Sequence, residues 1–82
     1  MPVDSVGEGR ALIDEIDRNI QELVRRRGEV SAAIQQLRVA AGEPRVSHSR
    51  ENEIISGYRS ALGRPGVAIA MATLAYCRGE LS

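Results

Sequence analysis

Residues 6–41 read VGEGRALIDEIDRNIQELVRRRGEVSAAIQQLRVAA, and this stretch decides the fold. Aliphatic residues recur along it at steps of three and four, the spacing of one face of an α-helix. We name this face the apolar stripe; its members are Ile13, Ile16, Ile20, Leu23, Val30, Ile34 and Leu37. Ser5 and Glu8 form a possible capping box, and Gly42-Glu43-Pro44 ends the pattern. The stretch therefore predicts one long helix over residues 6–41.

The length of this helix has a consequence for the assembly. At about 1.5 Å per residue, a helix over 6–41 is roughly 54 Å long. A compact domain of this size has a radius of gyration of only about 12 Å. The chain, with 82 residues in all, is too short to cover the whole apolar stripe. Small domains often complete their core by oligomerisation, so we expect an intertwined homodimer whose long helices pack together.

Two shorter helices are predicted in the remaining sequence. The second covers about residues 47–62 and begins with Ser47 or Ser49 as its N-cap. Its inward face is expected to carry Ile54, Ile55, Tyr58 and Leu62. Gly63-Arg64-Pro65-Gly66 predicts a break. The third helix, about residues 67–78, is apolar nearly all round, so we expect it to be buried. With no strand pattern, the sequence predicts one all-α domain over residues 1–82.

The composition narrows the class of protein. Eleven basic residues, all of them Arg, balance eleven acidic ones, which argues against a general nucleic-acid binder. Arginines bind carboxylates bidentately and keep their charge. A single cysteine, Cys77, excludes an internal disulfide framework. The polar start of the chain and the absence of a long apolar run predict a cytoplasmic protein without signal peptide or membrane span.

Three arginines of the long helix stand out. Arg27 occupies the next inward position after Leu23, where an aliphatic residue belongs. Burying an unpaired guanidinium is costly, so either the site of Arg27 is hydrated or an anion neutralises the charge. The alternatives are a structural ion pair with a Glu of another helix and a shift in phase of the apolar stripe. Arg38 lies on the same face about 16 Å further along. Arg10 points about 100° away from Arg27 and is either solvated or directed at a partner's site.

The start of the second helix is a further candidate site. It reads Ser47-His48-Ser49-Arg50-Glu51, and helix N-termini favour anions because their N–H groups are unpaired. Arg50 adds a cation. Glu51 adds a hydrogen-bond acceptor, or merely complements the helix dipole. His48 and Cys77 have no identifiable ligand partners, so we expect neither a metal nor a cofactor.

These residues together resemble the AroQ-type, all-helical chorismate mutase family, and most closely its small actinobacterial subclass. The resemblance covers most of the chain, from Arg10 to about Tyr58. Its elements are Arg10, Ile13-Asp14-Glu15-Ile16-Asp17-Arg18, Leu23-Val24-Arg25-Arg26-Arg27, Arg38 and Arg50-Glu51. The family rearranges chorismate to prephenate on the route to phenylalanine and tyrosine, without a cofactor. The subclass implies DAHP synthase, the first enzyme of the shikimate pathway, as an activating partner.

The resemblance also implies roles for the cationic residues. Arg27, and Arg10 of the other protomer, would each bind a substrate carboxylate at a shared site. Arg38 would contact the ether oxygen and a carboxylate. These roles suit a reaction that moves no proton and needs only a fixed conformer and stabilisation of charge on that oxygen.

At the second helix, the resemblance implies that Glu51 accepts a hydrogen bond from the ring hydroxyl. Arg50 would support the substrate side, and Ser47 stands where many members contact that hydroxyl. Many members also place a Gln or Glu of the last helix beside the ether oxygen. The sequence does not identify the corresponding residue in this chain, and the candidates for that place are Thr73, Tyr76 and Glu80.

Two alternatives remain at this stage. An isochorismate pyruvate lyase on the same fold also uses a cationic pocket for a dicarboxylate, but Arg50-Glu51 favours the mutase because the acid can hold the ring hydroxyl. A non-catalytic helical dimerisation or regulatory module is the other alternative. Arg27 argues against it, since a coiled coil would gain stability from an aliphatic residue there.

Overall fold

Three helices make up the structure, a computed structural model that describes residues 3–44 and 47–79. They are α1 (Val6–Ala41), α2 (His48–Leu62) and α3 (Arg64–Cys77), and the described residues contain no strand. The all-α, three-helix class predicted from the sequence is confirmed. None of the described helices is both long and apolar enough to cross a membrane.

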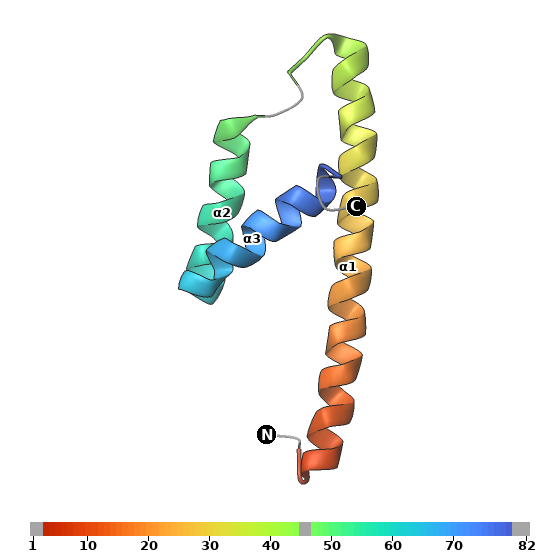
Figure 1. The fold of residues 1–82 in the computed structure, drawn as a ribbon, viewed down its shortest axis with the longest axis vertical. Coiled ribbons are helices and arrows are strands. Elements are labelled where there is room, and N and C mark those ends of the chain that lie inside the picture. The colour runs from red at the N-terminus through yellow and green to blue at the C-terminus, as the bar shows by residue number, and fades with distance from the viewer. Residues whose placement is uncertain (1–2, 45–46, 80–82) are drawn as a thin grey trace.

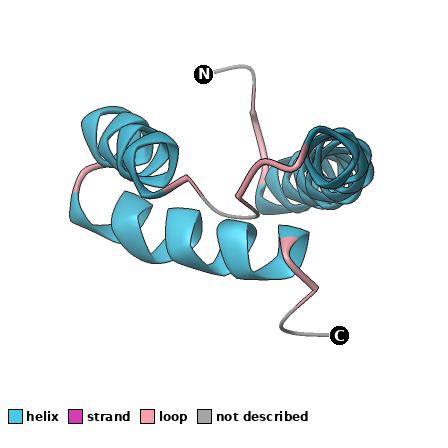
Figure 2. Ribbon diagram, turned by 90° about the horizontal axis from the view of Figure 1, so that it is seen from above, coloured by secondary structure: helices cyan, strands magenta, loops and turns pink. Residues whose placement is uncertain are grey.

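The helices form an open frame in which α3 is the connecting element. Figure 1 shows α2 running beside the C-terminal half of α1, with α3 crossing from the far end of α2 to the middle of α1. Seen from above, α3 spans the space beneath the other two helices (Figure 2). Among the described residues, α3 contacts both helices, whereas α1 and α2 do not contact each other. The space between α1 and α2 is therefore lined by both of them and closed on one side by α3.

Local hydrogen bonds set both ends of α1. The Ser5 Oγ accepts from the Glu8 backbone N–H at 3.1 Å, as the capping box predicts. The reciprocal bond differs, because the Glu8 carboxylate accepts from the Asp4 N–H at 2.9 Å rather than from that of Ser5. At the other end Gly42 adopts a left-handed φ of 74°, and its N–H donates to the Val39 carbonyl at 3.1 Å. Glycine favours this backbone conformation, so the helix ends where the sequence predicts.

The apolar stripe of α1 is exposed in the single chain. No residue of α1 is buried, and the members of the stripe are between 45% and 71% exposed. The chain is elongated, with a radius of gyration of 16.2 Å and a longest dimension of 55 Å. Its accessible surface is 6592 Å², whereas a folded monomer of this mass exposes roughly 4,800 Å². One chain therefore leaves uncovered the surface that a small domain normally buries.

The connection between α2 and α3 is shorter than predicted. Gly63 alone joins the helices, with a φ of 75° and a ψ of −156° that are essentially restricted to glycine. The third helix begins at Arg64, not at residue 67, and its last helical residue is Cys77 rather than residue 78. The predicted break is confirmed at Gly63, but its predicted extent over residues 63–66 was wrong, because Pro is tolerated in the first turn of a helix. Three of the four residues thus belong to α3.

The small core lies where α3 packs on α2. Gly66 lies so close to α2 that a Cβ atom built on it would be 2.2 Å from the Tyr58 carbonyl oxygen. Further along this face of α3, Ala70, Thr73 and Leu74 are buried. The expectation that α3 is buried all round was wrong for the single chain. The other face of α3 is exposed, and its large exposed apolar residues are Ile69, Met71 and Tyr76. Leu62 of α2, which the sequence predicts to face inward, is exposed as well.

Replacing Gly66 tests this close contact. Gly66→Ala should destabilise the protein by about 3 kcal/mol, because the added methyl group meets rigid backbone. Gly7→Ala is the matched control, since a Cβ there makes only an ordinary contact of 3.9 Å with the Ser5 Oγ. We expect it to change stability by less than about 1 kcal/mol. Urea unfolding followed by circular dichroism measures both, and equal effects of the two substitutions would contradict the packing described.

Candidate active site

A groove of about 1560 Å³ lies between the C-terminal half of α1, the start of α2 and the end of α3. It brings together residues that are far apart in the sequence. The predicted site residues that line it are Arg27, Arg38, Ser47, Arg50 and Glu51. A smaller side pocket of about 540 Å³ shares Arg27, Arg50 and Ile54 with the groove and continues along α2 to Leu62. Five of the six predicted residues thus line one space.

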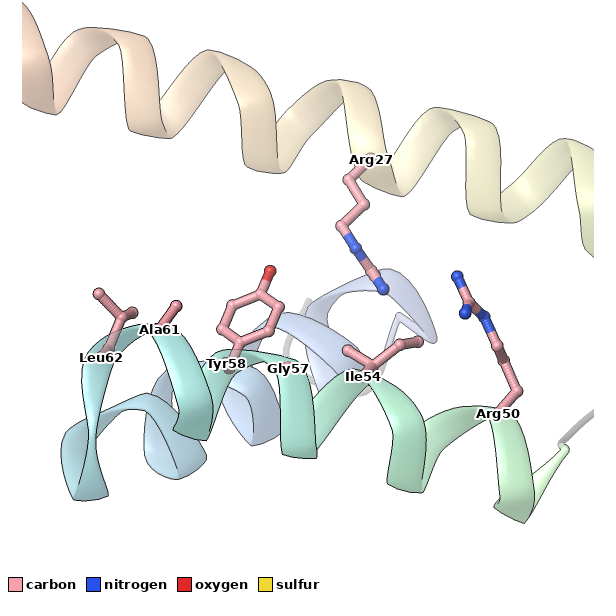
Figure 3. A pocket seen from close by; sticks show the side chains of 7 residues that line it. All are labelled: Arg27, Arg50, Ile54, Gly57, Tyr58, Ala61 and Leu62. Atoms are coloured by element: carbon pink, nitrogen blue, oxygen red, sulfur yellow. The ribbon is translucent and has the colours of Figure 1, made fainter.

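Arg27 reaches from α1 into the space in front of α2. Figure 3 shows its guanidinium directed toward α2, while Arg50 extends from α2 into the same space. Arg27 is half-buried, and its Nη1 donates to the Cys77 Sγ at 3.0 Å. No carboxylate of the described residues forms an ion pair with it. The alternative of a structural ion pair with a Glu is therefore not found within the described chain.

Arg38 lines the same groove as Arg27 and lies on the same face of α1, further toward its C-terminus. The periodicity of an α-helix predicts this arrangement from the sequence, because the step of eleven residues from Arg27 to Arg38 makes close to three full turns. Arg38 is half-buried and lies in the last turn of α1. Arg27 and Arg38 therefore line the groove from one rigid helix, at positions that differ along its axis.

The start of α2 supplies polar groups to the opposite wall. Ser47 is the N-cap, and its Oγ accepts from the Arg50 backbone N–H at 3.4 Å. The Arg50 Nη1 donates to the Glu53 carboxylate at 3.2 Å, but both side chains are more than 60% exposed. An exposed pair of this kind contributes little stability, so Arg50 can turn toward an anion in the groove at small cost.

Glu51 is held by a residue that sequence reasoning missed. Arg78, just beyond the end of α3, donates through Nη1 to the Glu51 Oε2. No local signal identifies this pair, because the residues lie 27 positions apart. A lone arginine after a helix is also an ordinary partner for the helix dipole. Only the folded chain brings the two side chains together.

Arg25 of α1 also lines the groove, but it is already paired with acidic residues. Arg25 forms ion pairs with Glu22 at 2.5 Å and with Glu29 at 2.8 Å, all on the exposed surface of α1. The hydrogen bond from Arg25 lowers the pKa of Glu22 below its ordinary value, and the same bond raises the pKa of Arg25. Arg25 is therefore occupied by two acids of its own helix on the exposed surface of α1.

Arg10 does not line the groove. It is exposed on the N-terminal half of α1, about 26 Å along the helix from Arg27.

Three residues are candidates for the position in the last helix that would lie beside the ether oxygen. The hydroxyl of Thr73 already donates a hydrogen bond to the Ile69 carbonyl at 2.7 Å. Tyr76 lines the groove, with its ring against Gly28, and Glu80 lies outside the described residues. Of the two candidates that the structure describes, Tyr76 is the one that lines the groove.

The described helices form an all-helical protein in which arginines of α1 and α2 line one groove, an arrangement that suits an anionic ligand. A family model described as chorismate mutase type II matches residues 9–73. The chain therefore belongs to the type II chorismate mutase family, a family of isomerases. The matched range contains all six predicted site residues. It ends before Tyr76, Cys77 and Arg78, three residues at the end of α3 that line the groove.

Named relatives and a solved structure agree with the family. The intracellular chorismate mutase of Mycobacterium tuberculosis is 44% identical over 80 residues, covering 98% of this chain and 75% of the relative. That of Mycolicibacterium smegmatis is 42% identical over 79 residues, covering 96% and 76%. The structural match is a chain from the non-covalent complex of DAHP synthase and chorismate mutase of Corynebacterium glutamicum with a bound transition state analog. It has a TM-score of 0.85 and 35% identity, covering 90% of this chain and 89% of that chain.

Removing Arg27 tests whether the groove binds a dicarboxylate. Arg27→Ala should raise the Kd of a dicarboxylate analogue of chorismate by about tenfold to a hundredfold, the cost of one charge-assisted hydrogen-bonded pair. Arg26→Ala is the matched control, because Arg26 is the exposed neighbour and does not line the groove. Isothermal titration calorimetry measures both affinities. Equal Kd values for the two variants would remove Arg27 from the binding site.

Proposed function

We propose that this groove converts chorismate to prephenate, and that its arginines carry the reaction. The observation that supports this most directly is Arg27, a half-buried cation at the groove with no carboxylate ion-paired to it among the described residues. Such a cation favours an anionic ligand, and chorismate carries two carboxylates. A purely structural helical module has no use for a cation at this place.

The proposed chemistry needs no proton transfer and no covalent intermediate. In one concerted step the bond between the ring carbon and the ether oxygen breaks while a C–C bond forms between the methylene carbon of the enolpyruvyl side chain and the ring. The ether oxygen stays with the side chain and becomes its ketone oxygen. Arg27 binds one carboxylate and holds the substrate in its compact, reactive conformer. Arg38 meets the negative charge that grows on the ether oxygen and also contacts a carboxylate. Both guanidiniums project from one rigid helix, so little reorganisation is needed during the reaction.

Residues of α2 orient the ring in this proposal. Glu51 accepts a hydrogen bond from the ring hydroxyl, and Ser47 lies at the same end of the groove. Arg50 supports the substrate side and gives up only its weak surface pair with Glu53. An acid placed to hold the ring hydroxyl favours chorismate over isochorismate as substrate. The mutase is therefore favoured over a lyase on the same fold.

The working unit in this proposal is a homodimer with shared sites. The exposed apolar stripe of α1 and the accessible surface of 6592 Å² support it, since burying apolar area is the main force in such association. Arg10 lies about 26 Å from Arg27 along α1, too far to reach the site of its own chain. In an antiparallel pairing of two α1 helices it reaches the site of the other protomer and binds a carboxylate there.

The cellular setting is proposed from the relatives. Those of the two mycobacteria are named intracellular, which supports a cytoplasmic place in the synthesis of phenylalanine and tyrosine. The structural match from C. glutamicum is part of a complex with DAHP synthase. DAHP synthase is therefore the proposed activating partner of this chain, in a complex of the same kind.

The role of Arg38 predicts a particular kinetic defect. Arg38→Ala should lower kcat for chorismate by about a hundredfold, because the lost contact acts on charge present only in the transition state. Arg38→Lys should keep more activity, since a cation remains near the oxygen. Arg59→Ala is the matched control, as Arg59 is the exposed basic residue in the last turn of α2. A folded Arg38→Ala variant with normal kcat would contradict the proposed function, as would activity with isochorismate alone.

Subunit mixing tests the shared sites. Arg10→Ala and Arg27→Ala chains should each be nearly inactive alone. After exchange, half of the dimers are heterodimers with one intact site of two, so about a quarter of the wild-type activity should return. Native mass spectrometry of the mixture, with one chain isotope-labelled, establishes that exchange has occurred. Exchange without any recovery of chorismate turnover would place Arg10 outside the site.

A further inference from the structure

The end of α3 contacts both walls of the groove through two adjacent residues. The Cys77 Sγ accepts a hydrogen bond from Arg27 of α1 at 3.0 Å. Arg78, the C-cap residue of α3, donates to Glu51 of α2. Figure 2 shows why one turn can do this, since α3 runs from beneath α2 to α1. The orientation of two proposed site residues thus depends on one helix end.

The ion pair between Arg78 and Glu51 differs from the pairs within single helices. Those of Arg25 with Glu22 and Glu29, and of Arg50 with Glu53, join residues three or four positions apart, with side chains 52% to 69% exposed. The side chains of Arg78 and Glu51 are 34% and 25% exposed and belong to different parts of the chain. A shielded pair is less screened by solvent and salt, so this pair restrains its side chains more than the surface pairs do.

The geometry of the pair leaves Glu51 able to act on a ligand. Arg78 donates to Oε2, and no other described residue donates to the Glu51 side chain. An ionised carboxylate accepts several hydrogen bonds, so Glu51, which lines the groove, can accept a further one from a ligand there. A glutamate without such a partner would sample several rotamers, and fixing it in advance lowers the entropy lost when substrate binds.

We propose that Arg78 is a positioning residue, which fixes the Glu51 carboxylate at the groove before the substrate arrives. The proposal rests on the function proposed above, in which Glu51 holds the ring hydroxyl. In this role Arg78, which also lines the groove, acts through Glu51. Its position just beyond α3 means that the last turn of this helix, and not α2 alone, determines the geometry of the acid.

A double-mutant cycle on kcat tests the positioning role. Arg78→Ala should lower kcat by about tenfold, because a misplaced acid no longer orients the ring, while Arg78→Lys should restore part of the loss. In a Glu51→Gln background, Arg78→Ala should change kcat by less than about twofold. Arg64→Ala is the matched control, since Arg64 is exposed at the opposite end of α3 and lines neither pocket. It should leave kcat unchanged.

Several results would overturn the proposal. Equal losses of kcat from Arg78→Ala in the wild-type and Glu51→Gln backgrounds would show that Arg78 acts independently of Glu51. Loss of helical circular dichroism in Arg78→Ala and also in the milder Arg78→Gln would make Arg78 a structural residue. If the wild-type protein does not convert chorismate at all, the proposed function fails separately. The same cycle on the thermal unfolding midpoint then tests the pair, and additive shifts would reject it.

Discussion

The helix α1 carries an apolar stripe that its own chain does not cover, and the rest of the structure depends on this mismatch. Along 36 residues it has no buried side chain, while the core of the chain is confined to the contact of α3 with α2. α3 is the one helix that touches both others. α3 consequently closes one side of the groove between α1 and α2. A second chain that covers the stripe would complete the core and also bring Arg10 to the groove.

Rigid helices are a suitable support for the proposed chemistry. The rearrangement of chorismate needs its two carboxylates held and the charge on one oxygen stabilised, with no nucleophile. Arg27 and Arg38 project from one long helix, so their spacing is set by covalent geometry and hydrogen bonds that do not change during the reaction. The α2 wall adds an acceptor, Glu51, which the end of α3 holds in place.

The sequence predicts the parts of this structure that depend on local pattern. The bounds of α1 follow from its periodicity and from Ser5 and Gly42, and the common face of Arg27 and Arg38 follows from helix geometry. The predicted start of α3 was wrong because the sequence Arg64-Pro65-Gly66 is compatible with both a loop and a first helical turn. The close contact of Gly66 with α2 is a tertiary property, which local sequence does not reveal. The pairing of Arg78 with Glu51 is also invisible in the sequence, because it exists only after α3 has folded back across the groove.

The assembly is the central claim of this account, and the molar mass of the folded chain in solution tests it most directly. Sedimentation equilibrium at micromolar concentration should give twice the mass of one chain. Replacing Ile16 and Ile20 of the stripe by Asp, two residues 53% and 52% exposed in the single chain, should abolish association and chorismate turnover together. A wild-type chain that sediments as a well-folded monomer and still rearranges chorismate would contradict the account.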